Sequence, residues 1–124
     1  GTRSAADIAK FCHDNFAKGN AEAIVGIWAD DVVHAVANRT ATIPYSGVYF
    51  GVPQGAEWLK SFASAGVKYK LLETHPVNDC MCFSISECTY ADGSKGQECM
   101  RWVSEDGKMK TWTLYGNTVR HGKK

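Results

Sequence analysis

The sequence predicts a single α+β domain in which helices come first and a long antiparallel sheet follows. Apolar residues recur at helical spacing through the first half of the chain, whereas the second half reads as successive strands. Two Asp-Gly pairs, Asp92-Gly93 and Asp106-Gly107, separate the last three strands, and Asp-Gly is a strong hairpin signal. With 124 residues, the chain is expected to fold as one domain, 1–124, with a substantial core.

The first predicted helix covers residues 5–18. Ser4 followed by Asp7 resembles a capping box, and Gly19 ends the helix. Its apolar residues fall at helical spacing: Ile8, Phe11, Cys12 and Phe16. His13 falls on the polar side and is expected to be exposed.

A short second helix is capped by Asn20, and its apolar stripe is Ile24, Ile27 and Trp28. Asp30-Asp31 is expected to end it before a β-branched strand, VVHAV. The segment ANRTATIPYSG predicts a loop, followed by a short strand, VYF. Pro53 suits the first turn of a third helix that runs to about residue 65.

The rest of the chain predicts strands over residues 68–74, 81–90, 95–103 and 109–115. With two-residue turns at both Asp-Gly pairs, Glu87 lies opposite Glu98, and Glu98 faces Tyr115. Alternation then sorts the side chains into two faces. One face is expected to curl over the helices: Phe83, Ile85, Glu87, Glu98, Met100, Trp102, Thr111, Thr113 and Tyr115. The other carries Cys82, Ser84, Ser86, Cys88, Cys99, Arg101, Val103, Lys110, Trp112 and Leu114.

Two carboxylates and a phenol therefore meet at one end of an apolar surface. Opposed like charges destabilise a sheet, and burial would raise at least one pKa, so that Glu87 and Glu98 share a proton and act as an acid or base near neutral pH. Two alternatives remain open. The first is that both glutamates reach solvent at an open end of the sheet. The second is that a turn shifted by one residue separates them.

The second face is too apolar to be freely exposed, and Arg101 opposite Trp112 is placed for cation–π stacking. We expect a homodimer through Cys99, Arg101, Val103, Trp112 and Leu114. The alternative is a terminal segment that folds across this face.

Composition and residue spacing argue against several classes of function. The formal net charge is +1 with scattered lysines and arginines, so no basic stripe predicts nucleic-acid binding. No apolar run is long enough to span a membrane, and we expect no signal peptide because no such pattern opens the sequence. Five cysteines without C-x-x-C spacing favour reduced thiols in the cytoplasm over disulfides or a zinc site, and we expect no metal and no cofactor.

The stretches FAKGNAEAIVGIWADDVVHAV, PYSGVYFGVPQGAEWLKSF and ECMRWVSEDGKMKTWTLYGN resemble nuclear transport factor 2-like domains, in particular the branch of SnoaL-type polyketide cyclases and ketosteroid isomerase. The resemblance spans nearly the whole chain. It implies an α+β barrel of the nuclear transport factor 2-like, or cystatin-like, type. In that type a cone-shaped, curved antiparallel sheet wraps around three N-terminal helices and encloses a deep apolar pocket.

The resemblance does not imply that this chain has the isomerase's activity. The isomerase's tyrosine, basic aspartate and protonated aspartate fall on Cys12, Val36 and Glu98, so the proton-shuttling base is missing. The epoxide-hydrolase branch has an R-x-D on one strand, where this chain has RWV.

His34 shares parity with Val36 and is expected to look into the cone, where it replaces the missing base; the alternative is a core histidine bonded to the loop. Glu98 is expected to be a neutral acid, Glu87 its pKa-setting partner and Tyr115 an orienting donor. The expected substrate-binding residues are Trp28, Tyr45, Tyr49, Trp58, Phe62, Phe83, Ile85, Met100, Trp102 and Thr113.

Two functions are compatible with these residues. The first is a cofactor-independent isomerase, cyclase or lyase that acts by acid–base chemistry on a small hydrophobic carbonyl or hydroxyl compound. The second is a non-catalytic module that uses the same cavity for ligand binding or dimerisation.

Overall fold

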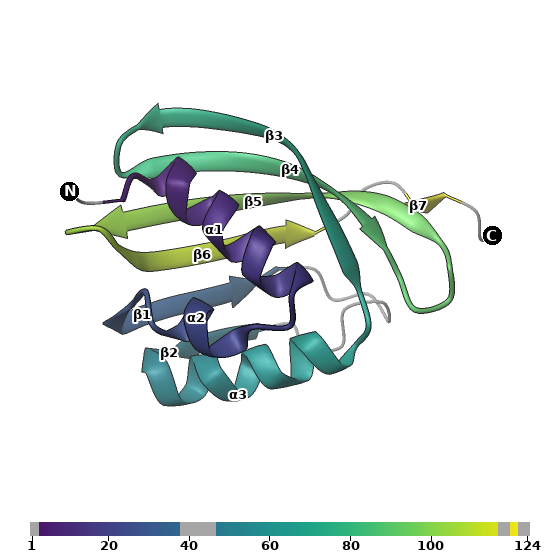
Figure 1. Cartoon of the computed structure of the whole chain (residues 1–124), viewed down its shortest axis with the longest axis horizontal. Coiled ribbons are helices and arrows are strands. Elements are labelled where there is room, and N and C mark those ends of the chain that lie inside the picture. Colours follow the sequence, from purple (N-terminus) through teal and green to yellow (C-terminus); the bar gives the residue numbers. More distant parts are fainter. Residues whose placement is uncertain (1–2, 38–46, 117–119, 122–124) are drawn as a thin grey trace.

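The computed structural model describes residues 3–37, 47–116 and 120–121 (Figure 1). The helices are α1 (Ala5–Ala17), α2 (Ala21–Val25) and α3 (Gly51–Ser64). The strands are β1 (Trp28–Val36), β2 (Gly47–Phe50), β3 (Lys68–Asn78), β4 (Met81–Thr89), β5 (Lys95–Glu105), β6 (Lys108–Gly116) and β7 (Arg120–His121).

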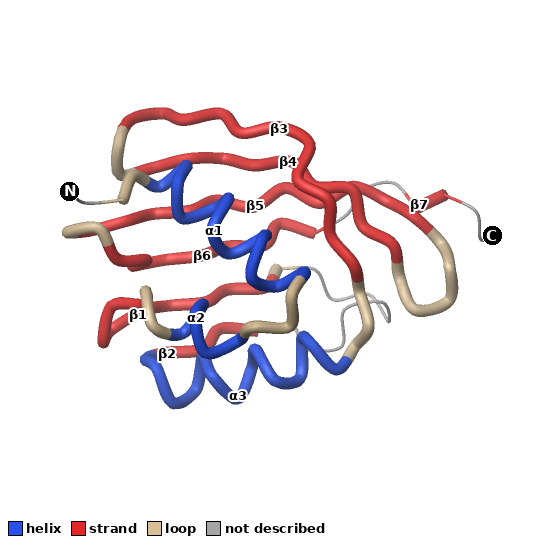
Figure 2. Tube along the Cα trace, in the orientation of Figure 1, coloured by secondary structure: helices blue, strands red, loops and turns tan. Residues whose placement is uncertain are grey.

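The strands form one curved, unclosed sheet in the order β2-β1-β6-β5-β4-β3, and β7 pairs with β5 (Figure 2). Helix α1 packs on β3, β4 and β5, while α3 packs on β1 and β2. The predicted α+β architecture of three helices against a curved sheet is confirmed. Among the described strands of this path, β1 and β6 are the one parallel pair, so the sheet is mixed rather than wholly antiparallel.

Helix α1 begins with the predicted capping box. The Ser4 hydroxyl accepts from the Asp7 amide at 3.1 Å, and the Asp7 carboxylate accepts from the Ser4 amide at 3.3 Å. These bonds satisfy two of the donors that a helix start leaves free. The face of α1 that meets the sheet is small and apolar, and it consists of Ala5, Ile8, Ala9 and Cys12.

Strand β1 begins earlier than predicted. Gly26 closes α2, so Trp28 is the first residue of the strand rather than part of a helical stripe. Asp30 and Asp31 lie within β1 and are both exposed, because the β1–β6 register shifts between Trp28 and Val33. Asp31 pairs with Lys110 on β6.

The predicted register of the β4–β5 hairpin is wrong by one residue. Tyr90 donates its amide to the Ser94 carbonyl at 2.8 Å, and Gly93 donates to the Tyr90 carbonyl at 2.9 Å. With Gly93 at φ 85°, this is a three-residue loop rather than a two-residue turn. Glu98 therefore pairs with Ser86, and Glu87 pairs with Gln97.

The β5–β6 hairpin has the predicted two-residue turn, with Asp106 at φ 53° and Gly107 at φ 77°. Its register nevertheless shifts between Val103 and Ser104, where Lys110 is the extra residue on β6. Trp102 therefore pairs with Trp112 instead of Thr111. The bulge turns Trp112 and Leu114 toward the helices.

Together these two shifts reassign the faces. The helix-facing side of β4, β5 and β6 carries buried residues: Cys82, Ser84, Ser86, Cys88, Glu98, Met100, Trp102, Trp112 and Leu114. Phe83, Ile85 and Thr113, expected on that side, lie on the outer face instead. Trp112 and Leu114, expected in a dimer interface, belong to the core.

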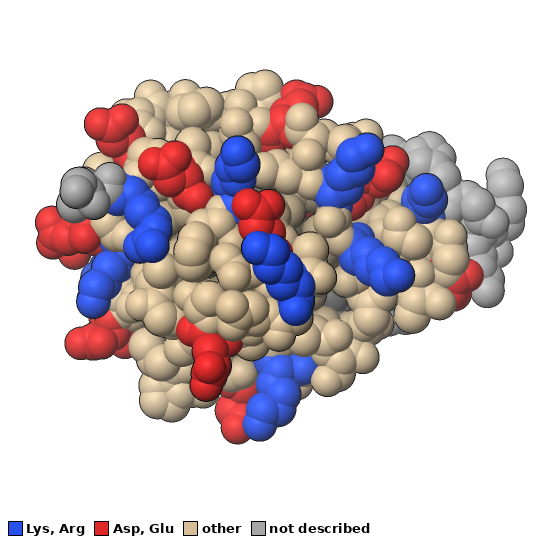
Figure 3. Space-filling model, viewed as in Figure 1, with Lys and Arg blue, Asp and Glu red and all other residues tan. Residues whose placement is uncertain are grey.

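Charge on the surface is mixed. On the face in Figure 3, lysines and arginines alternate with aspartates and glutamates rather than forming a stripe of one sign. None of the helices in the described residues is long and apolar enough to cross a membrane. The described residues also hold no group of three or more His, Cys, Asp or Glu side chains placed to share a metal ion.

Asp92 stabilises the three-residue loop, because its Oδ1 accepts from the Ser94 amide at 2.9 Å and from the Ser94 hydroxyl at 2.6 Å. Asp92→Ala is expected to lower the free energy of unfolding by about 1 kcal/mol, measured by urea denaturation. Asp92→Asn keeps the acceptor and should retain most of that stability. Equal losses in the two variants would contradict this account of the loop.

Candidate functional site

A cavity of about 60 Å³ lies between the helices and the inner face of the sheet. Its lining is almost entirely apolar and aromatic: Cys12, His13, Phe16, Ile24, Trp28, His34, Trp58, Leu59, Phe62, Tyr69, Met100, Trp102, Met109 and Trp112. All four tryptophans of the chain are in this set. No Lys, Arg, Asp or Glu lines the cavity within the described part of the chain.

His34 reaches this cavity from β1, where it pairs with Tyr49 on β2 and Trp112 on β6. Its side chain is only 1% exposed, and its ring lies between Trp28 and Trp58, at centroid distances of 4.3 and 4.8 Å. Burial lowers the pKa of His34 to about 4, so the imidazole is neutral at pH 7. The structure thus places His34 at the cavity, as strand parity predicted.

Gly55 on α3 makes room for this arrangement. A Cβ at that position would lie 3.0 Å from His34 Nδ1 and 3.0 Å from Trp28 Cζ3. A side chain there would need the two rings to move. Gly55 was not predictable from the sequence, because its importance arises from a contact between a helix and a strand far apart in the chain.

Neither nitrogen of His34 has a hydrogen-bond partner among the described residues. The same holds for the indole nitrogens of Trp28 and Trp58. By contrast, the Trp102 indole donates to the Ser84 hydroxyl at 2.8 Å. The unpartnered nitrogens therefore belong to His34 and to the two indoles that pack on its ring.

Glu98 is 1% exposed but does not line the cavity. Its carboxyl accepts from the hydroxyls of Tyr69 and Tyr90, each at 2.9 Å. Burial raises the pKa of Glu98, and the two phenol bonds oppose that rise. Because the Tyr69 ring does line the cavity, Glu98 is connected to it through Tyr69. Neither tyrosine was predicted as a partner of Glu98: Tyr69 lies on β3, two strands from β5 in the sheet, and Tyr90 precedes the turn whose length was wrong.

The expected partners of Glu98 lie elsewhere. Glu87 is on the outer face of β4, half-buried, with the opposite parity to Glu98. Tyr115 is 47% exposed on the outer face of β6. The proposed pair of opposed glutamates was wrong because it depended on the two-residue turn, and neither Glu87 nor Tyr115 is near the cavity lining.

His13 is a second histidine at the cavity, and the expectation that it is exposed was wrong. Its Nδ1 lies 2.8 Å from the Ala9 carbonyl, which only accepts, so Nδ1 carries the proton. Burial lowers the pKa of His13, so the ring is neutral and Nε2 accepts from the Ser86 hydroxyl at 2.7 Å. The small serines on the inner face of β4 thus bond to residues that line the cavity.

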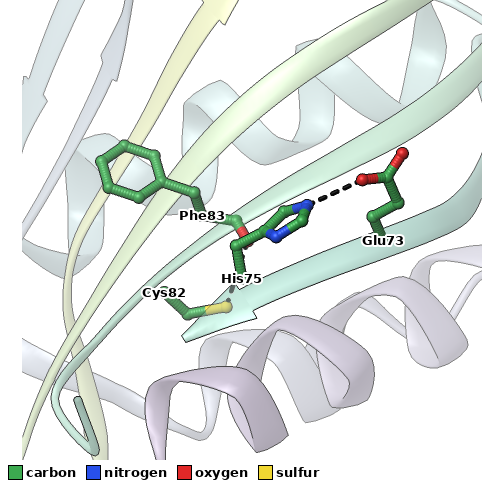
Figure 4. Close-up of polar contacts among 4 residues, drawn as sticks. All are labelled: Glu73, His75, Cys82 and Phe83. Carbon is green, nitrogen blue, oxygen red and sulfur yellow. Dashed lines mark hydrogen bonds and ion pairs between the residues drawn. The ribbon is translucent and has the colours of Figure 1, made fainter. Parts of the chain in front are cut away.

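His75 lies away from the cavity. Its Nε2 is 2.7 Å from the Glu73 carboxylate on the same strand, and both side chains are more than half exposed (Figure 4). The nearby Cys82 thiol donates to the Phe83 carbonyl at 3.3 Å. This group is a surface hydrogen bond beside a buried thiol, and it contributes nothing to the lining.

Of the expected substrate-binding residues, five line the cavity: Trp28, Trp58, Phe62, Met100 and Trp102. Tyr49 packs on the Trp58 ring at 6.1 Å without lining the cavity. Tyr45 lies outside the described residues. On the outer face, Cys99, Arg101 and Val103 are half-buried, but Trp112 is inside, so the Arg101–Trp112 stack is wrong. The homodimer stays a prediction.

No family model and no curated protein matches this sequence. Solved structures match closely in backbone. A computationally designed 17-OHP binder superposes with a TM-score of 0.79 at 17% identity, covering 98% of this chain and 100% of that one. RV0760c from Mycobacterium tuberculosis, in complex with estradiol-17beta-hemisuccinate, gives 0.78 at 17% identity, with coverages of 94% and 96%. The Delta 5-3-ketosteroid isomerase from Mycobacterium sp. gives 0.72 at 16%, with coverages of 91% and 92%.

The chain has the nuclear transport factor 2-like fold. The fold that the sequence resemblance implied is therefore confirmed, and ketosteroid isomerase is among its structural neighbours. At these identities the likeness concerns the fold and not the activity.

Within this nuclear transport factor 2-like fold, the three positions that the sequence resemblance matched to the isomerase's tyrosine and two aspartates lie in different surroundings. Cys12 lines the cavity, and burial raises the pKa of its thiol to about 12. Val36 is a buried core residue. Glu98 keeps a carboxyl group but faces two tyrosines rather than the cavity. His34, Trp28 and Trp58 are the lining residues whose ring nitrogens have no partner among the described residues.

Proposed function

We propose that this protein binds a small, largely apolar molecule in the cavity between its helices and sheet. The observation that carries this proposal is the lining: aromatic and aliphatic side chains surround the space, and three of them, Trp28, His34 and Trp58, carry unpartnered ring nitrogens. Binding sites for small molecules typically combine an apolar wall with a few polar groups that orient the ligand.

Two neighbours with this fold support a hydrophobic ligand. One is the designed 17-OHP binder, and the other is the M. tuberculosis protein in complex with estradiol-17beta-hemisuccinate. The cavity of about 60 Å³ is far below the roughly 300–1,000 Å³ that drug-sized ligands occupy. A larger ligand must therefore displace side chains.

The side chains best placed to move are the half-buried ones of the lining: His13, Phe16 and Tyr69. Phe16 packs on Phe62 and Tyr69, at centroid distances of 5.2 and 5.8 Å, and Phe62 stacks on Tyr69 at 5.6 Å. This aromatic cluster joins α1, α3 and β3. We expect a ligand to enter by separating it.

Cofactor-independent acid–base catalysis is the second candidate function: isomerisation, cyclisation or dehydration of the bound molecule. Two observations support it. His34, a neutral imidazole, and Tyr69 both line the cavity, and the Tyr69 hydroxyl donates a hydrogen bond to Glu98. In this candidate His34 is the base and Tyr69, with Glu98, the acid. A pKa of about 4 makes His34 a weak base at pH 7, which is why ligand binding is the favoured function.

Tryptophan fluorescence tests binding directly, because all four tryptophans line the cavity. Titration with estradiol or 2-naphthol is expected to give a saturable change in emission. At a hundredfold excess over the Kd, ligand should also add about 2.7 kcal/mol to the free energy of unfolding. N-acetyltryptophanamide controls for quenching in solution. If neither emission nor thermal stability changes with either compound, the binding proposal fails.

A further inference from the structure

Three of the buried side chains that line the cavity carry polar ring atoms. Trp28, His34 and Trp58 are 4%, 1% and 5% exposed, and their four ring nitrogens have no hydrogen-bond partner among the described residues. Each buried polar group left without a bond destabilises a fold by roughly 1–3 kcal/mol. Such a cluster indicates that something else satisfies these atoms.

The packing against α3 orients two of these rings so that one nitrogen of each lies on the side away from the helix. At the Gly55 position, a Cβ would meet the Nδ1–Cε1 edge of His34 and the Cζ3 atom of Trp28. His34 Nε2 is thus the imidazole nitrogen farther from α3. In an indole, Nε1 lies across the ring system from Cζ3, so the Trp28 donor also lies on the side away from Gly55.

The hydrogen-bonding groups of the three rings limit which ligand atoms they can bind. Each indole offers one N–H and no acceptor, while a neutral imidazole offers one N–H and one lone pair. An oxygen with two lone pairs matches two N–H donors. A carboxylate or phosphate does not match, because no Lys or Arg in the described lining compensates a buried negative charge.

We infer that Trp28, His34 and Trp58 form a polar subsite that binds the neutral oxygen of an uncharged ligand and discriminates against its acidic analogues. This inference rests on the proposed function, since it assumes that a ligand occupies the cavity.

Three matched probes test the subsite: cyclohexanone, methylenecyclohexane and cyclohexanecarboxylate at pH 7. The ketone is expected to bind about tenfold more tightly than the hydrocarbon, and the carboxylate more weakly than the ketone. In ¹H–¹⁵N spectra the ketone should shift the indole signals of Trp28 and Trp58 downfield. The Trp102 signal, already bonded to Ser84, is the internal control and should move less.

Substitutions test whether the subsite, rather than the cavity as a whole, produces the preference for the ketone. Trp58→Phe and, independently, Trp28→Phe remove one donor each and should reduce the ketone-to-hydrocarbon ratio by about threefold or more. Tyr90→Phe also removes a buried donor, but one that does not line the cavity, and it should leave the ratio unchanged.

The outcomes distinguish the two proposals. If none of the three probes binds, the proposed function and the subsite both fail. Equal affinities for ketone and hydrocarbon, or tighter binding of the carboxylate, would overturn the subsite alone. A ratio that survives both tryptophan substitutions would overturn it as well.

Discussion

Lowering the pH from 7 to 4 is expected to reduce the free energy of unfolding by on the order of 3 kcal/mol through His34 alone. In the unfolded chain a histidine titrates near 6.5, whereas burial lowers the pKa of His34 in the fold to about 4. Between these values the unfolded state binds the proton and the folded state does not. The contribution of neutral His34 to the free energy of unfolding is therefore fully present above pH 6.5 and is lost as the pH falls toward 4.

The measurement is urea unfolding at several pH values between 4 and 7.5, with His34→Phe as the comparison. The variant should have a shallower dependence, because it has no imidazole at this site. Two other groups respond in the same range. Burial also lowers the pKa of His13, which adds a loss of the same sign, while the raised pKa of Glu98 opposes it. Identical slopes in wild type and His34→Phe would contradict the assignment to His34.

Gly55→Val is expected to reduce stability by about 3 kcal/mol and to close the His34 end of the cavity. Even the Cβ would lie 3.0 Å from His34 Nδ1 and Trp28 Cζ3, so three added carbons force both rings to move. Gly55→Ala should cost less, because it adds a single carbon and gains about 1 kcal/mol of helix propensity. Near-ultraviolet circular dichroism should report the displaced tryptophans.

Lys60→Val is the matched control, since it places the same side chain on the exposed face of α3. It measures the intrinsic cost of valine in this helix, which is under about 1 kcal/mol. If Gly55→Val were no more destabilising than Lys60→Val, the close approach of α3 to His34 and Trp28 would be wrong.

The helices were predictable because their signals are local. Ser4 and Asp7 lie three residues apart and cap α1 whatever the rest of the chain does. The apolar spacing of Trp58 and Phe62 likewise identified the buried face of α3. His34 reached the cavity as predicted because parity within one strand needs no partner.

The site was less predictable because it depends on how strands pair. A three-residue loop at Asp92-Gly93 and a bulge at Lys110 each moved one strand by a single residue. A shift of one residue sends every side chain to the opposite face. Glu87 was therefore separated from Glu98, and Trp112 moved from the expected partner surface into the core.

Periodicity and capping within short stretches were enough to predict the α+β class, the three helices and the placement of His34. Only the tertiary structure decided which residues share the cavity. The Asp-Gly signal is the same at both turns, but the Gly93 turn is a three-residue loop braced by Asp92 and Ser94, and the Gly107 turn has two residues. Likewise, Gly55, His34, Trp28 and Trp58 become one site only when α3 packs on β1, a contact that no local pattern encodes.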